Sequence, residues 1–102
     1  MDYPDIARAV GQAVASEGFD QGILVCGTGI GMSITANKIR GIRAALCYNP
    51  FSARLAREHN DANILCLGGE ILGEGLAKAI ITAYLEARFQ GGRHHEYMRL
   101  DA

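Results

Sequence analysis

A cysteine followed by closely spaced glycines is the feature of this sequence with the clearest chemical potential. Cys26 ends an apolar run, and Gly27, Gly29 and Gly31 follow it within the stretch VCGTGIGMS. Glycines allow backbone N–H groups to converge on a small volume, where they would stabilise an anion or a developing oxyanion. The same electropositive surroundings favour a thiolate over a thiol. The pattern therefore predicts that Cys26 is a catalytic base or nucleophile.

The alternative for any cysteine is that it packs as a small hydrophobic side chain in the core. For Cys47 and Cys66, which lie in apolar segments without such a loop, we favour this alternative. For Cys26 we favour a function, because an expected strand ends at this residue and ligands of open parallel sheets gather at the carboxyl ends of strands.

Familiar ligand-binding loops do not fit the residues around Cys26. A Walker A loop needs a lysine, which does not occur before Lys38, and a dinucleotide fingerprint needs GxGxxG where this chain has GxGxG. A cysteine phosphatase loop would have an arginine where this chain has Met32, and no GxSxG nucleophile elbow is present. Nucleotide binding and phosphate ester hydrolysis are therefore disfavoured.

Two further groups of polar residues could take part in chemistry. His59 and Asn60 lie at an expected helix end, where a histidine can carry a proton to or from a sugar oxygen. Polar residues at a helix end, however, more often only meet solvent and the helix dipole. The second group begins with Arg93, whose guanidinium could bind a phosphate. The two histidines that follow it are neighbours on the chain and make a poor metal site on their own.

Hydrophobic periodicity and turn residues predict alternating helices and strands. We expect helices at 2–18, from 30–33 to 41, at 51–58 and at 74–89, and strands at 22–26, 42–47 and 62–67. The run at 22–26 is apolar throughout, which is typical of a parallel strand covered on both faces. Asn49 and Pro50 supply a cap and a first-turn proline. The inward face of the last helix is expected to carry Leu76, Ile80, Ala83 and Ala87.

This order of elements is typical of an α/β fold with an open parallel sheet and right-handed crossovers. Three strands make a small sheet, and the leading helix leaves one sheet edge without a partner. We therefore expect a single domain over residues 1–90, a C-terminal tail over residues 91–102, and a sheet edge that pairs with another chain.

Composition and charge disfavour several broad classes of protein. The chain has 102 residues, of which 49% are hydrophobic and 21% charged, and its net charge of -1 does not suggest a nucleic-acid partner. No apolar run approaches the roughly 20 residues of a membrane span, and the segment MDYPDIARA does not resemble a signal peptide. Three cysteines without CxxC spacing argue against disulfides and a zinc site. We expect a cytoplasmic protein without a metal or membrane partner.

Four motifs follow one another along nearly the whole chain: DYPD, GILVCGTGIGMSITANKIRGIRAALC, REHNDANILCLGG and GGRH. Together they resemble the type B ribose-5-phosphate isomerase family, which includes galactose-6-phosphate isomerase subunits. The resemblance implies a Rossmann-like α/β fold and a homodimer with active sites between the chains. It also implies interconversion of an aldose phosphate and its ketose without a cofactor.

By position, the resemblance implies which residues transfer the proton and which stabilise the enediolate. Cys26 would be the base that moves a proton between C1 and C2. Thr28 would hold the enediolate together with the backbone N–H groups of Gly27, Gly29, Gly31 and Ser33.

The resemblance also implies residues that bind the rest of the sugar phosphate. His59 would assist ring opening, and Asn60 would lie beside it at the sugar. Arg93 would bind the phosphate, and Tyr3 would line the sugar pocket.

The sequence departs from the family pattern in two places. Family members usually begin well before the DYPD motif, with a strand that carries an Asp-His pair, a helix and a second strand; the sheet here would be a shortened form of one with about five strands. Tyr97 stands where the family commonly has a second phosphate arginine. Three explanations fit the lack of this N-terminal segment: a truncated start, a separate chain that supplies the first strands, and a loss of catalysis. Two hypotheses stay open: a sugar-phosphate isomerase, and a non-catalytic dimerising or sugar-phosphate-binding module.

Overall fold

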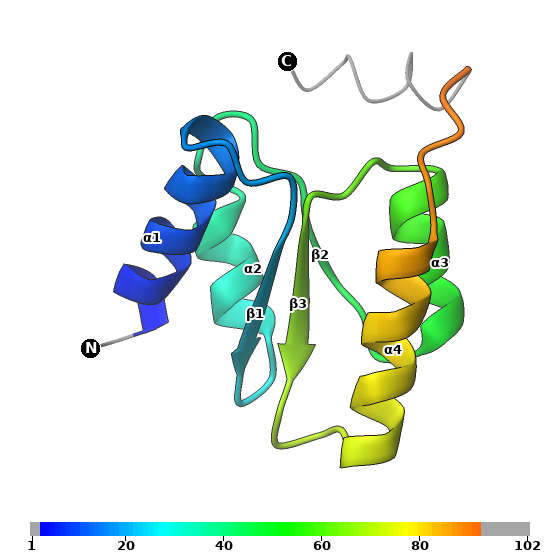
Figure 1. Ribbon diagram of the computed structural model, residues 1–102. Helices are drawn as coiled ribbons and strands as arrows, with labels where there is room; N and C mark the ends of the chain where they lie inside the picture. The colour runs from blue at the N-terminus through cyan, green and yellow to red at the C-terminus, as the bar shows by residue number, and fades with distance from the viewer. Residues whose placement is uncertain (1–2, 93–102) are drawn as a thin grey trace.

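The computed structural model describes residues 3–92, in which helices and strands alternate (Figure 1). The elements are α1 (Tyr3–Ser16), β1 (Gly22–Cys26), α2 (Ile30–Ala36), β2 (Ala44–Leu46), α3 (Pro50–Glu58), β3 (Ile64–Gly68) and α4 (Glu74–Glu86). Their order and the open parallel sheet confirm the predicted α/β fold. No helix within this described part is long and apolar enough to cross a membrane.

Several elements are shorter than the sequence predicts. α2 ends at Ala36 and does not continue to Gly41. The Asn37 side chain explains this end, because it accepts a hydrogen bond from the Ala44 amide at 2.8 Å and donates one to the Ala44 carbonyl at 2.9 Å. These bonds join the end of the helix to the start of β2. α4 likewise stops at Glu86, since the next residue already has extended backbone.

β3 is the central strand of the sheet, whose order is β1-β3-β2. All five residues of β3 are buried, as expected for a parallel strand covered on both faces. Gly22 pairs with Ile64 and Cys26 pairs with Gly68, so β1 and β3 end at the same level. We call this end of the sheet the carboxyl edge and the opposite end the amino edge.

Two hydrophobic clusters cover the two faces of β3, because successive side chains of a strand point to opposite faces. Ile64 and Cys66 face α1 and α2, together with buried residues such as Leu24 and Met32. Leu65 and Leu67 face α3 and α4; the other buried members of that cluster are Cys47, Ala53, Ala56, Ala62, Ile80 and Tyr84. Figure 1 shows the two helix pairs on opposite sides of the sheet.

The predicted packing role of Cys47 and Cys66 is confirmed, since both thiols are buried in these clusters. Burial, and to a smaller extent the neighbouring Cys26 and Cys47, raise the pKa of the Cys66 thiol to about 12. Burial also raises the pKa of Cys47, which a hydrogen bond with Ser52 partly offsets. Both side chains are therefore neutral thiols at neutral pH and unsuited to nucleophilic chemistry.

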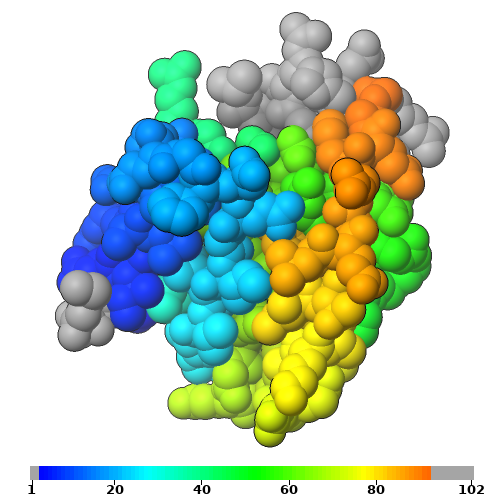
Figure 2. All heavy atoms as spheres, in the orientation of Figure 1, coloured from blue at the N-terminus to red at the C-terminus, as the bar shows by residue number. Residues whose placement is uncertain are grey.

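The prediction that the strand at 22–26 is covered on both faces is wrong. Val25 is 53% exposed and Ile23 is 37% exposed, because β1 is an edge strand and α4 packs over β3 and α3. Figure 2 shows this part of the chain at the surface, between α1 and α4.

The predicted inward face of the last helix is wrong in part. Ile80 is fully buried as expected, but the second buried residue is Tyr84, four positions later. Leu76 is 42% exposed, and Ala87 lies beyond the end of α4. The helix presents an Ile80–Tyr84 stripe to the sheet because the large phenol ring fills the space over β3 and reaches the Ala62 carbonyl at 3.0 Å.

Candidate active site

Cys26 is the last residue of β1 and lies half-buried at the carboxyl edge. Its Sγ accepts a hydrogen bond from the Gly29 amide at 3.2 Å. A backbone N–H directed at sulfur stabilises the thiolate, which is the form that abstracts protons and attacks carbon. One of the amides expected from the sequence is therefore directed at the thiol itself.

Residues 27–29, which we call the glycine loop, pack directly on the end of β3. Gly29 has φ +83°, and a Cβ at this position would lie 2.5 Å from Leu46 Cδ1 and 2.9 Å from the Leu67 carbonyl carbon. Gly68 is equally restricted, since a Cβ there would lie 2.6 Å from the Thr28 carbonyl oxygen. Gly29 therefore needs both the backbone freedom and the small size of glycine, and Gly68 needs the small size.

Backbone hydrogen bonds fix the start of the glycine loop to the turn after β3. The Gly69 amide donates to the Cys26 carbonyl at 2.7 Å, and the Glu70 amide donates to the Gly27 carbonyl at 3.0 Å. The loop after β1 and the turn after β3 are thus joined, and these hydrogen bonds fix the backbone of Cys26 relative to β3.

Some of the polar groups at the start of α2 form hydrogen bonds within the helix and its preceding turn. The Ile30 amide donates to Thr28 Oγ1 at 3.2 Å, and the Ser33 amide donates to the Gly29 carbonyl at 3.1 Å. Ser33 Oγ donates to the Ile30 carbonyl at 2.8 Å. Gly31 lies in the first turn, where an amide has no acceptor within the helix. Of the predicted donors, the Ser33 amide is therefore engaged within α2 and the Gly29 amide is engaged by sulfur.

Tyr3 reaches the same place from the first residue of α1. Its ring covers Gly31, where a Cβ would lie 2.6 Å from Tyr3 Cε1 and 2.9 Å from the hydroxyl oxygen. Tyr3 is 47% exposed, so the phenol borders on solvent next to the glycine loop. This position is compatible with the pocket-lining role that the sequence predicts.

Sequence reasoning missed two residues of the carboxyl edge, Tyr48 and Glu70. The Tyr48 hydroxyl donates to the Thr28 carbonyl at 2.7 Å. The Glu70 carboxylate covers Gly27, where a Cβ would lie 3.1 Å from Oε2. Each residue follows closely on the end of a strand, and the rule that ligands bind at the carboxyl ends of parallel strands could have drawn attention to both.

His59 and Asn60 lie at the other end of the sheet from Cys26. His59 caps the carboxyl end of α3, where its amide donates to the Leu55 carbonyl at 2.8 Å, and β3 starts five positions later, at Ile64. The register places Ile64 opposite Gly22, four residues before Cys26. At about 3.3 Å per residue this separates the two edges by roughly 13 Å along the strands. A single chain does not bring His59 to Cys26.

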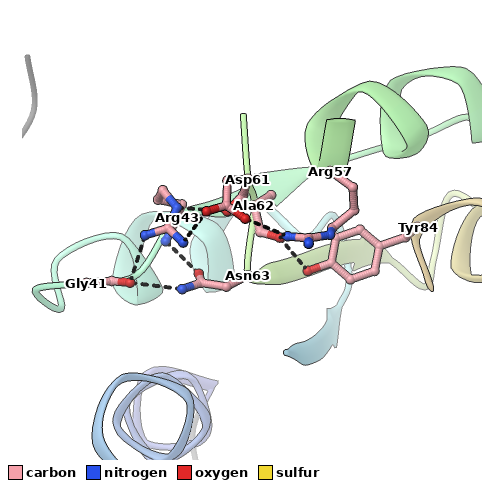
Figure 3. Close-up of polar contacts among 7 residues, drawn as sticks. All are labelled: Gly41, Arg43, Arg57, Asp61, Ala62, Asn63 and Tyr84. Atoms are coloured by element: carbon pink, nitrogen blue, oxygen red, sulfur yellow. Dashed lines mark hydrogen bonds and ion pairs between the residues drawn. The ribbon is translucent and has the colours of Figure 1, made fainter. Parts of the chain in front are cut away.

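A network of polar contacts holds the loop that carries Asn60 (Figure 3). Asp61 accepts from Arg43 at 3.2 Å and from Arg57 at 3.1 Å, and its backbone has φ +49°. The Ala62 carbonyl accepts from Arg57 at 2.6 Å and from the Tyr84 hydroxyl at 3.0 Å. The donors are Arg43, just before β2, Arg57 in α3 and Tyr84 in α4, and together they fix the backbone on both sides of the loop.

Arg93 and Tyr97 lie outside the described residues. The described chain ends on the His59 side of the sheet, since the Gln90 amide donates to the Glu58 carbonyl at 2.9 Å. Within residues 3–92, no group of three or more His, Cys, Asp or Glu side chains could hold a metal ion.

Comparisons with known proteins agree with one another. The family model described as Ribose/Galactose Isomerase matches residues 1–100. The ribose-5-phosphate isomerase B of Escherichia coli is 53% identical over 95 residues, and the D-erythrulose-4-phosphate isomerase of Pectobacterium atrosepticum is 50% identical over 90 residues. These alignments cover 93% and 88% of this chain but 64% and 59% of the relatives, so the chain spans about six tenths of their length.

A solved structure of ribose-5-phosphate isomerase B from Clostridium thermocellum superposes with a TM-score of 0.96 at 52% identity. The match covers 99% of this chain and 68% of that chain. The described fold is therefore the fold of that protein over the matched part, and about a third of that protein has no counterpart here.

Proposed function

Because the chain belongs to the ribose/galactose isomerase family, we propose that it interconverts an aldose phosphate and its ketose, with Cys26 as the base. One observation carries this proposal: the Gly29 amide donates to Cys26 Sγ at the carboxyl edge, within a loop whose close approach to β3 requires glycine at position 29. A thiolate so placed has the chemistry to remove a proton from a carbon next to a carbonyl group.

In the proposed reaction, the Cys26 thiolate takes the proton from C2 of the open-chain aldose. The electrons of that C–H bond form the C1–C2 double bond of an enediolate, and the negative charge moves to the carbonyl oxygen at C1. A proton passes from the oxygen at C2 to the oxygen at C1, and Cys26 returns its proton to C1 to give the ketose. No atom is gained or lost, and no oxidant or cofactor is consumed.

The negative oxygen of the enediolate needs hydrogen-bond donors close to Cys26. We assign this role to Thr28 and to the amides of Gly27 and Gly31, because the Ser33 and Gly29 amides already have acceptors. Removing a single donor of this kind costs about 3 to 4 kcal/mol in comparable oxyanion sites. Tyr3 borders this volume and would cover the sugar.

The remaining residues of the site would come from a second copy of the chain. His59 and Asn60 lie at the amino edge, away from Cys26 of their own chain, so a site that uses all three requires a homodimer in which one carboxyl edge faces the partner's amino edge. Arg93, which lies outside the described residues, keeps its proposed role as the phosphate ligand. His59 would donate or accept the proton that opens the sugar ring.

The substrate choice of the first experiment follows from ring chemistry. A tetrose 4-phosphate cannot close a furanose ring, because its oxygen at C4 carries the phosphate, whereas a pentose 5-phosphate can. We expect this chain to interconvert erythrose 4-phosphate and erythrulose 4-phosphate, with or without turnover of ribose 5-phosphate.

The Cys26→Ala variant tests the proposed base. It should lower kcat on the tetrose phosphate by about 10²- to 10⁴-fold, which is the usual contribution of a general base. Cys47→Ala is the matched control, because Cys47 is a buried thiol at the end of β2 and should keep its activity when folded. Activity in Cys26→Ala equal to that of the wild type would disprove the assignment.

A second candidate function is a non-catalytic module that binds sugar phosphates. The described chain alone does not bring His59 to Cys26, and binding without turnover would be compatible with that separation. Binding of ribose 5-phosphate by calorimetry, combined with no turnover of either the pentose or the tetrose phosphate, would support this candidate over the isomerase.

A further inference from the structure

Tyr48, which no sequence motif singled out, contacts the glycine loop from the other edge strand. It follows β2 by two positions, and its hydroxyl donates to the Thr28 carbonyl at 2.7 Å. The Tyr48 side chain is 37% exposed. Because β3 lies between β1 and β2, the hydrogen bond joins the loops that follow the two outer strands. The distance is the usual one for a well-made O–H···O hydrogen bond.

The acceptor of this bond belongs to the peptide unit that contacts the sulfur. The Thr28 carbonyl and the Gly29 amide are the two ends of a single planar peptide group, in which the C=O and N–H point in opposite directions. Tyr48 holds the oxygen end, and the Gly29 N–H donates to Cys26 Sγ at 3.2 Å. Fixing the carbonyl therefore also fixes the direction of the N–H.

The neighbouring peptide groups of the loop are held differently. The carbonyls of Cys26 and Gly27 accept from the backbone amides of Gly69 and Glu70, which no side-chain substitution removes. The Thr28 carbonyl accepts from a side chain. Flanked by Gly29, which has unusual backbone freedom, this peptide group would rotate most readily if its carbonyl lost its donor.

We propose that Tyr48 is a positioning residue for Cys26: its hydroxyl orients the Thr28–Gly29 peptide so that the Gly29 N–H stabilises the thiolate. Hydrogen bonds at both ends of one peptide group also polarise it in the same sense, which strengthens its N–H as a donor. The proposal rests on the role of Cys26 in the proposed function and adds a residue that acts through the backbone, without contact with the substrate.

The test is the rate at which iodoacetamide alkylates Cys26 in the full chain, followed by mass spectrometry of the peptide that contains it. Tyr48→Phe removes the hydroxyl and keeps the ring. We expect the rate at neutral pH to fall about three-fold or more, because a charge-assisted hydrogen bond to the thiolate is weakened. Cys47 and Cys66 are buried and report in the same sample on whether the fold is intact.

Tyr84→Phe is the matched control. It also removes one tyrosine hydroxyl that donates to a backbone carbonyl, that of Ala62 at 3.0 Å, but at the amino edge of the sheet. It should lower the melting temperature and leave the alkylation rate of Cys26 in the folded protein unchanged. Equal Cys26 rates in Tyr48→Phe and the wild type would overturn the inference. Faster alkylation of Cys47 and Cys66 in Tyr48→Phe would also overturn it, because the hydroxyl would then stabilise the fold as a whole.

Turnover of erythrose 4-phosphate separates this inference from the proposed function. If the chain is an isomerase, Tyr48→Phe should lower kcat and leave KM nearly unchanged, since Tyr48 does not touch the sugar. If the wild type has no turnover but Tyr48→Phe still slows the alkylation of Cys26, the proposed function fails and the positioning role stands. A change in KM alone would contradict the positioning role.

Discussion

At the scale of single residues, the three cysteines show how position decides the chemistry of a side chain. Cys26 is half-buried at the end of an edge strand and accepts a backbone hydrogen bond at sulfur. Cys66 lies in the central strand between the two layers of helices, where it is fully buried. Burial raises its pKa to about 12 because the core does not solvate a thiolate.

The raised pKa of Cys66 predicts a loss of stability in alkali. The neutral thiol favours the folded state, so its contribution is fully present below pH 9, the ordinary value for the unfolded chain, and is lost as the pH rises toward 12. We expect this thiol to lower the free energy of unfolding by about 1.4 kcal/mol per pH unit in that window. Urea unfolding in reductant should show a shallower alkaline slope for Cys66→Ala, and equal slopes would refute the prediction.

At the scale of elements, the glycine loop depends on contact between backbones. Gly29 and Gly41 both have positive φ, +83° and +89°, but a Cβ at Gly41 would meet nothing within 4 Å. At Gly29 it would meet Leu46 and the backbone of Leu67. The two positions therefore separate the cost of backbone conformation from the cost of overpacking.

Gly41→Ala should cost about 1 kcal/mol of stability, which is the typical penalty of a left-handed alanine. Gly29→Ala should cost about 1 to 3 kcal/mol more, because the loop must move away from β3. It should also slow the alkylation of Cys26, since the Gly29 amide then moves from sulfur. Thermal unfolding and iodoacetamide kinetics measure the two effects, and equal behaviour of the two variants would contradict this account of the loop.

At the scale of the whole molecule, the proposed site is divided between the two edges of the sheet. Cys26 lies at the carboxyl edge and His59 at the amino edge. On β1, Ile23 and Val25 are exposed, and the outer side of this strand pairs with no other strand of residues 3–92. An open strand edge with apolar side chains tends to pair or to be covered. Both features favour an assembly of more than one chain.

The shared site predicts complementation between two inactive variants. Mixing Cys26→Ala with His59→Ala and allowing the dimers to exchange should restore about one quarter of the wild-type activity, because half of the dimers are mixed and each contains one intact site. The assay uses ribose 5-phosphate, because erythrose 4-phosphate has no ring for His59 to open, and each variant alone is the control. No recovery after verified exchange would contradict the shared site, and so would a stable monomer in light scattering.

The sequence by itself determined the order of the elements and the place of Cys26 at the end of the first strand, and the catalytic role of Cys26 stays a prediction. These depend on local patterns: the apolar run before Cys26, the glycines after it, and the Asn49 cap, whose side chain accepts from the Ser52 amide at 2.7 Å. Such signals act over a few residues, and they predicted the fold class and the buried state of Cys47 and Cys66.

Only the tertiary structure decided the strand order β1-β3-β2, and most other features follow from it. That order leaves Val25 exposed on an edge strand although its segment is as apolar as the central one. It also brings Tyr48 to the Thr28 carbonyl and keeps His59 at the opposite edge from Cys26. The pairing of strands is a choice among contacts between segments far apart in sequence, and their free energies depend on how whole faces pack, which no local pattern records.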